Sequence, residues 1–280
     1  KYRLCPRPVG RDRPVPTASD LLIAGYDSQA LPSAQFGALR GWLHRLLAWQ
    51  IQATRAAYGA LADDEYRGLY IPDAEADMLG VGFPELPPDL AAERAALERE
   101  RVVLERDDDE SALARAGQLF GLSRFERDTL LLALLPELDL RYERVIAYIQ
   151  DDVTKKRPTV DLALRLLCAA PEDIPAARAC FAPSAPLLRH RLIQLYEDGQ
   201  RHAPLLARFV KIDERIAAEL LGGQPDALDV SLVAAATLTR PARRIDSLIL
   251  PAELAARLRR AWLAPERPVL ALQGGDGSGR

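Results

Sequence analysis

Residues 122–135 read LSRFERDTLLLALL, and this stretch decides the fold. Ser123 and Glu126 have the spacing of a capping box, in which the hydroxyl and the carboxylate each accept a hydrogen bond from a free backbone amide. The run from Leu130 to Leu135 is wholly apolar, so no side of the helix that it forms is suited to water. The chain is therefore expected to be built around a buried helix that begins at Ser123.

Short helices are predicted on both sides of this segment. Ser111 is placed to cap a helix that ends at Gly121 in the left-handed conformation, and Asp139 is placed to cap another. Pro158 stops the chain before a further helix from Thr159 to Cys168. Three short helices in succession form a familiar compact unit.

A β-hairpin is predicted after these helices. Residues 191–197 and 205–212 are rich in β-forming side chains, and residues 198–204 form the loop between them. Asp213 then caps a helix that ends at Gly222. Helices followed by a hairpin favour a winged-helix domain over residues 110–223.

The region before this domain is also predicted to be helical. Apolar residues recur with helical period from Gln35 to Leu61, which indicates one long amphipathic helix. Over residues 89–106 leucines recur every seven residues, as in a coiled-coil seam. The other seam positions hold charged residues, which favours a largely solvated surface helix; they are Glu93, Arg94, Glu100 and Arg101.

Several motifs together resemble the winged-helix domain that precedes the AAA module of certain bacterial and archaeal ATPases. They are residues 122–128, 135–139, 141–142, 147–154, 157–159, 162–163 and 211–216, and more weakly 67–71. The resemblance implies a mainly α fold with a β-hairpin wing. It also implies an association with contractile, phage-tail-like injection systems, in which an ATPase remodels or assembles parts of the machine.

The expected organisation has five parts. They are a flexible proline-rich lead-in (1–34), a helical N-terminal region (35–106), the winged-helix domain (110–223), a helical connector (224–267) and the truncated start of an AAA module (268–280). The missing initiator Met and the glycine-rich end suggest a piece of a longer chain. We expect a non-catalytic interaction or regulatory region whose partners are a protein client or neighbouring ATPase subunits.

The strongest chemical signal is a glycine-rich stretch over residues 274–280, which follows the strand-like run Val269 to Leu272. Gly274 and Gly279 match the first and sixth positions of a phosphate loop, where small residues let backbone amides surround phosphate oxygens. Arg280 stands where the loop requires Lys, and its wide planar guanidinium does not replace a compact ammonium. ATP and Mg²⁺ are therefore cofactors expected of the full-length parent, and none is expected for this chain; a flexible Gly-Ser tail is the alternative.

DNA binding is the alternative function. Lys155, Lys156 and Arg157 precede the helix that begins at Thr159 and could meet phosphates while that helix enters the major groove. Aspartates flank this group, and Arg165 is the only strong base reader of the helix. Further basic residues lie in and near the hairpin and beyond it; they are Arg189, His190, Arg191, Arg201, His202, Arg208, Arg240, Arg243 and Arg244.

Composition limits the other classes of function. The net charge of −3 gives no overall attraction to nucleic acid. Cys5, Cys168 and Cys180 lack metal-binding spacing, as do the three histidines, so we expect reduced thiols, no metal and a cytoplasmic location. No apolar run reaches the length of about 20 residues that a membrane helix requires. We expect no membrane partner and no catalytic triad.

Overall fold

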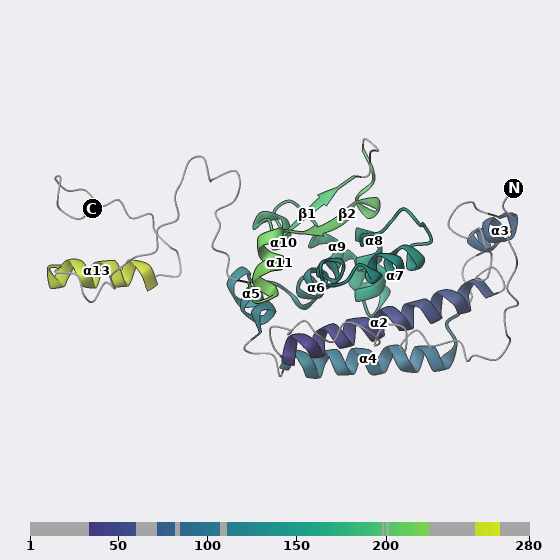
Figure 1. The fold of residues 1–280 in the computed structure, drawn as a ribbon, viewed down its shortest axis with the longest axis horizontal. Coiled ribbons are helices and arrows are strands. Elements are labelled where there is room, and N and C mark those ends of the chain that lie inside the picture. Colours follow the sequence, from purple (N-terminus) through teal and green to yellow (C-terminus); the bar gives the residue numbers. More distant parts are fainter. Residues whose placement is uncertain are drawn as a thin grey trace, which may run out of the picture. The chain divides into compact units, whose positions relative to one another are not determined.

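A computed structural model describes residues 34–59, 72–81, 85–106, 111–197, 199, 202–223 and 250–263. The chain falls into two compact units, Lys1–Pro225 and Asp226–Arg280. The described elements of the first unit (Figure 1) are α2 (Ala34–Tyr58), α3 (Asp73–Val81), α4 (Pro88–Arg106), α5 (Ala112–Phe120), α6 (Arg124–Leu138), α7 (Arg141–Ile149), α8 (Val160–Leu167), η2 (Pro171–Asp173), α9 (Ile174–Ala179), α10 (Pro186–Arg189), β1 (Ile193–Tyr196), η3 (Leu205–Ala207), β2 (Phe209–Ile212) and α11 (Glu214–Leu220).

Helices α2 and α4 pack side by side as an antiparallel pair (Figure 1). The indole N–H of Trp42 donates to the carbonyl of Leu97 at 2.9 Å, and the indole N–H of Trp49 donates to that of Leu90 at 2.8 Å. The later residue of α2 thus meets the earlier residue of α4, so the helices run in opposite directions. The long amphipathic helix expected from Gln35 is confirmed and ends at Tyr58.

The prediction that α4 is largely solvated is wrong at one position. Arg101 is only 2% exposed, and its guanidinium lies over the ring of Trp42 at 5.5 Å from the ring centre. It also binds the carboxylate of Asp128 on α6, with nitrogen–oxygen distances of 2.6 to 3.1 Å. A charged residue at a seam position is buried here because another element supplies an opposite charge.

The caps of α5 are those expected from the sequence. The hydroxyl of Ser111 accepts a hydrogen bond from the amide of Ala114 at 3.0 Å. Gly121 ends the helix with a φ of 65°, and the amide of Leu122 then donates to the carbonyl of Gly117 at 2.9 Å. A left-handed residue is favourable for glycine because it has no Cβ.

The capping box at the start of α6 is also confirmed. The amide of Ser123 donates to the Glu126 carboxylate at 2.8 Å, and the amide of Glu126 donates to the Ser123 hydroxyl at 3.3 Å. Every residue from Leu130 to Leu135 is buried. The next helix, α7, begins at Arg141, whose amide donates to the Asp139 carboxylate at 2.8 Å.

Strands β1 and β2 form the antiparallel hairpin of the expected wing, with Ile193 opposite Ile212 and Tyr196 opposite Phe209. Thr159, just before α8, forms an isolated antiparallel bridge with Phe209, on the edge of β2 that is not paired with β1. On either side of this bridge the amide of Val160 donates to the carbonyl of Arg208 at 2.9 Å, and the carbonyl of Pro158 accepts from the amide of Val210 at 2.8 Å. The second strand is shorter than expected, because residues 205–207 form a 3₁₀ turn.

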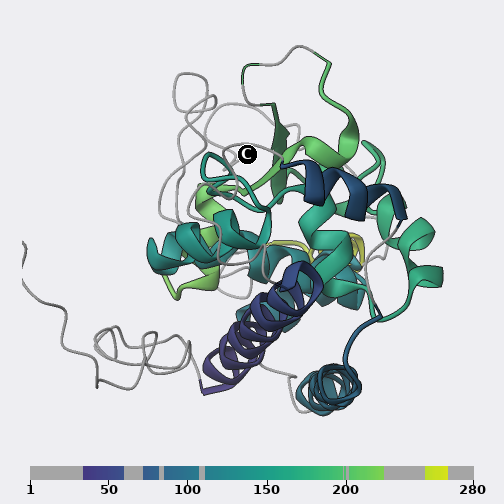
Figure 2. The same cartoon turned by 90° about the vertical axis from the view of Figure 1, so that its right-hand side faces the viewer.

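One hydrophobic core is shared by α2, α4 and the described helices and strands from α5 to α11, whereas none of the described side chains of α3 belongs to it. Helix α2 contacts α4, α7 and α8, and Figure 2 shows α2 (purple) more nearly along its axis than Figure 1 does. The segments expected as a separate helical region and a winged-helix domain therefore share a single core within the first unit. In the second unit the structure describes helix α13 (Ala252–Leu263) and the two residues before it.

Candidate functional site

The loop between α7 and α8 carries the basic group Lys155, Lys156 and Arg157. Lys155 pairs with Asp152 at 3.5 Å and Arg157 with Glu137 at 3.1 Å, so nearby carboxylates offset both charges. Lys156 is exposed. The three residues are thus neighbours on the surface, but they form a weak cationic patch.

Gln150, at the end of α7, fixes the shape of this loop. Its amide nitrogen donates to the carbonyls of Lys155 and Arg157, both at 2.9 Å. Its amide oxygen accepts from the Thr159 amide at 3.0 Å and from the Thr159 hydroxyl at 2.6 Å. Asp151 adopts a φ of 51°, which is uncommon for a residue other than glycine. One side chain therefore holds both ends of the loop.

Helix α8, which would be the reading helix under the alternative DNA-binding interpretation, is mostly buried. Its buried residues are Val160, Leu162, Ala163, Leu164, Leu166 and Leu167. Of the rest, Arg165 donates to the carboxylate of Asp161 at 2.8 Å. Arg94 of α4 donates to the carbonyls of Leu166 and Cys168 at 2.9 and 3.2 Å, which satisfies the C-terminal end of the helix.

The elements between α8 and the hairpin are short. Helix α9 has six residues and α10 has four. At about 1.5 Å per residue they are about 9 and 6 Å long, far shorter than a helix that follows a major groove. On the wing, Arg208 pairs with Glu197 at 3.0 Å, and the amide of His202 donates to the same carboxylate at 3.1 Å.

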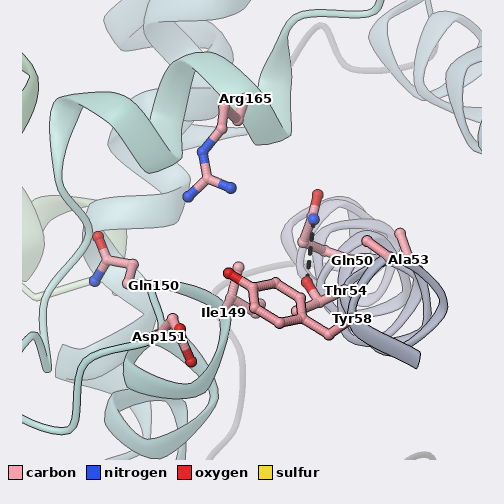
Figure 3. Close-up of a pocket in the computed structure, with 9 residues that line it drawn as sticks. Gln50, Ala53, Thr54, Tyr58, Ile149, Gln150, Asp151 and Arg165 are labelled. Carbon is pink, nitrogen blue, oxygen red and sulfur yellow. Dashed lines mark hydrogen bonds between the residues drawn. The ribbon is translucent and has the colours of Figure 1, made fainter. Parts of the chain in front are cut away.

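A cavity of about 300 Å³ lies where α2, the end of α7 and α8 meet (Figure 3). Its lining residues are Gln50, Ala53, Thr54, Ala57, Tyr58, Ile149, Gln150, Asp151 and Arg165. Figure 3 shows the guanidinium of Arg165 directed from α8 toward this space, with Tyr58 and Thr54 on the side of α2. Sequence reasoning missed the cavity, because its walls are about 100 residues apart in the chain.

Of the three histidines, His44 is partly buried, whereas His190 and His202 are exposed. His44 lies between α2 and α7, where its Nδ1 is 3.3 Å from the Tyr142 hydroxyl. Burial, and then the nearby arginines, lowers the pKa of His44, which favours its neutral form. Within the described ranges no cluster of His, Cys, Asp and Glu is arranged to hold a metal ion.

Two other expectations fall partly or wholly outside the described residues. The phosphate-loop residues Gly274, Gly279 and Arg280 lie outside them, as do Arg201, Arg240, Arg243 and Arg244. Cys168 and Cys180 are described and are free thiols, whereas Cys5 is not described. The described helices include none with the length and apolar character needed to span a membrane.

The comparisons with known proteins bear on the fold. Neither a curated protein nor a solved structure matches the chain. A family model described as "winged helix domain, variant" matches residues 85–236, so the matched region begins with the segment that leads into α4 and continues past α11. This match covers more than half of the 280 residues, and the elements from α4 to α11, with the β1–β2 hairpin, lie within it. The chain therefore belongs to the winged helix domain family, in its variant form.

Proposed function

We propose that this variant winged-helix region is a non-catalytic, protein-binding part of an AAA-type ATPase that remodels or assembles a larger machine. The observation that carries the protein-binding part is the position of α8. A winged helix that reads DNA needs a helix free to enter the major groove. Here α8 is packed on α2 and fastened to α4 through Arg94, and its exposed Arg165 is paired with Asp161.

The charge distribution supports the same proposal. Binding to a phosphate backbone requires several unopposed cationic side chains on one face. Lys155, Arg157 and Arg208 each have a carboxylate within 3.5 Å. A surface of alternating charge suits a protein partner better, because paired charges give orientation without attracting polyanions.

The ATPase part rests on the resemblance of the sequence and on the glycine-rich stretch that ends at Arg280. In the full-length protein, replacing Arg280→Lys should tighten the binding of a fluorescent ATP analogue, since an ammonium fits between the terminal phosphates. Equal affinity of the two versions would mean that residues 274–280 are not a phosphate loop.

A duplex titration tests protein binding against DNA binding. The 280-residue chain should show no sub-micromolar affinity for mixed-sequence duplex at low salt. Affinity in that range that falls steeply with salt would overturn the proposal, and loss of this affinity in a variant with Lys155, Lys156 and Arg157 each changed to Gln would place the DNA contact on the α7–α8 loop.

A further inference from the structure

The cavity between α2, α7 and α8 exists because one stripe of α2 changes its composition. Positions 39, 43, 46, 50, 53 and 57 follow one face of the helix at alternating spacings of four and three residues. The first three are leucines, all buried in the core. The last three are Gln50, Ala53 and Ala57, and all three line the cavity. The stripe that fills the core at one end of α2 therefore leaves space at the other.

The guanidinium of Arg165 is the group in the cavity lining that is best placed to bind a ligand. Its Nε donates to Asp161 at 2.8 Å, which uses one side of the guanidinium. Among the described residues no hydrogen bond occupies its two terminal nitrogens, and Figure 3 shows them directed toward the cavity. A pair of parallel N–H groups matches the two oxygens of a carboxylate.

The other lining residues suit the hydrocarbon part of a side chain that ends in a carboxylate. Ala53, Ala57 and Ile149 provide apolar surface. Gln50 donates to the Thr54 hydroxyl at 3.5 Å, which is a long contact that a ligand can replace. The amide nitrogen and oxygen of Gln150 both already form hydrogen bonds to the α7–α8 loop. The side chain of Gln150 is therefore a fixed part of the cavity wall. The volume of about 300 Å³ is at the lower end for ligand pockets and matches a single side chain with its backbone.

We propose that this cavity binds an acidic side chain, Glu in preference to Asp, from an extended segment of a protein partner, with its carboxylate on the terminal nitrogens of Arg165. The proposal rests on the protein-binding function above and assigns that function a site. Glu is favoured because its stem has one more methylene than that of Asp, which can cover more of the apolar part of the lining while the carboxylate meets the guanidinium. Asp151 also lines the cavity, and its negative charge opposes any acidic group there, so binding requires that the attraction of Arg165 exceed this repulsion.

The test is a titration of the 280-residue chain followed by the methyl NMR signals of Ala53, Ala57 and Ile149. The probes are the blocked tetrapeptide acetyl-Ala-Leu-Glu-Ala-amide, its Gln counterpart and free glutarate. We expect saturable shifts with the Glu peptide and at least tenfold weaker binding of both the Gln peptide and glutarate. Equal affinity for the Glu and Gln peptides, or no shift with any probe, would overturn the proposal. Glutarate binding as tightly as the Glu peptide would overturn the assignment to a protein partner.

Variants separate the role of Arg165 from a general effect on folding. Arg165→Gln should abolish the preference for Glu over Gln, and Ala57→Leu should block both peptides by filling the cavity. Asp161→Asn should strengthen Glu binding two- to threefold, because it removes the competing carboxylate. The control Arg178→Gln changes an exposed arginine on α9 and should leave affinity unchanged.

Unchanged binding in Arg165→Gln, with its melting temperature preserved, would contradict the site. The duplex titration is independent of this outcome. A negative duplex result together with equal binding of the two peptides would remove the cavity site and leave the protein-binding function standing.

Discussion

Arg101 places its guanidinium between Trp42 of α2 and the Asp128 carboxylate of α6, and so joins three helices at one buried point. One of its terminal nitrogens is buried without a hydrogen-bond partner among the described residues. Such a pair is held by its geometry, since removing both charges from water costs nearly as much as their attraction returns. Loss of one partner is therefore far more harmful than loss of both.

Arg101→Ala should lower the free energy of unfolding by about 3–5 kcal/mol, because it leaves the carboxylate of Asp128 buried without a counter-charge. Arg99→Ala, at an exposed position of the same helix, should change it by less than about 0.5 kcal/mol. Urea denaturation measures both. The double variant Arg101→Met, Asp128→Leu should recover most of the loss; a double variant as unstable as Arg101→Ala would refute this account of the pair.

The pH dependence of stability follows from the same carboxyl group. Burial raises the pKa of Asp128 to about 6, although Arg101 opposes the shift. Between its ordinary value of 3.8 and about 6 the folded state binds a proton that the unfolded state releases. The stability that this group contributes is therefore complete below about pH 4 and is lost as the pH rises through about 6.

A comparison of the chain with Asp128→Asn isolates this effect, because Asn does not titrate. As the pH falls from 7 to 4.5, the free energy of unfolding of the unaltered chain should rise relative to that of the variant. The pKa of His44 is shifted in the opposite direction, downward, in the folded state. Protonation of His44 therefore lowers the stability of both proteins alike as the pH falls. This effect cancels in the difference. A difference that is constant with pH would show that Asp128 titrates near its ordinary value.

At the scale of elements, Gln150 determines the loop that joins α7 to α8. Gln150→Ala should leave the buried Thr159 amide and the hydroxyl hydrogen of Thr159 without their acceptor and cost about 1–3 kcal/mol. Amides of residues 154–157 and 159 should then exchange with deuterium faster, since their loop loses its internal anchor. Gln118→Ala, at an exposed position on α5, is the matched control and should leave exchange unchanged. Equal exchange in both variants would mean that the loop holds its shape without Gln150.

The elements that the sequence predicted best are those determined by neighbouring residues. Ser111, Ser123 and Asp213 cap helices because each acts within three positions of itself. The burial of Arg101 could not be predicted in the same way, because its partner lies 27 residues away and the local pattern offers only a charge at a seam position. The cavity was out of reach for a similar reason. Nothing in the local sequence of α2 indicated that Arg165, more than 100 residues later in the chain, would face Gln50, Ala53 and Ala57.

At the scale of the whole molecule, the shared core bears on where a folding unit can begin. A winged-helix domain was expected from residue 110, whereas the family model begins at residue 85 and the compact unit includes α2. Helix α2 contributes large buried side chains to the core; they are Phe36, Leu39, Trp42, Leu43, Leu46 and Leu47. Each contributes about 1.5–3 kcal/mol by burial. Together they contribute about 9–18 kcal/mol, which is comparable to the total stability of a domain, about 5–15 kcal/mol.

We therefore expect three pieces of the chain to behave differently. Residues 34–225 should unfold cooperatively with a midpoint close to that of the whole chain, because they retain the core of the first unit. Residues 85–236 keep Arg101 but lose α2, and should melt without a cooperative transition. Residues 110–223 also lose Arg101, which leaves Asp128 without its partner, and should be the least ordered. Circular dichroism and thermal melting measure all three. A cooperative transition in residues 110–223 at the midpoint of the whole chain would show that the winged helix folds without α2 and α4, and that these two helices are an addition to it.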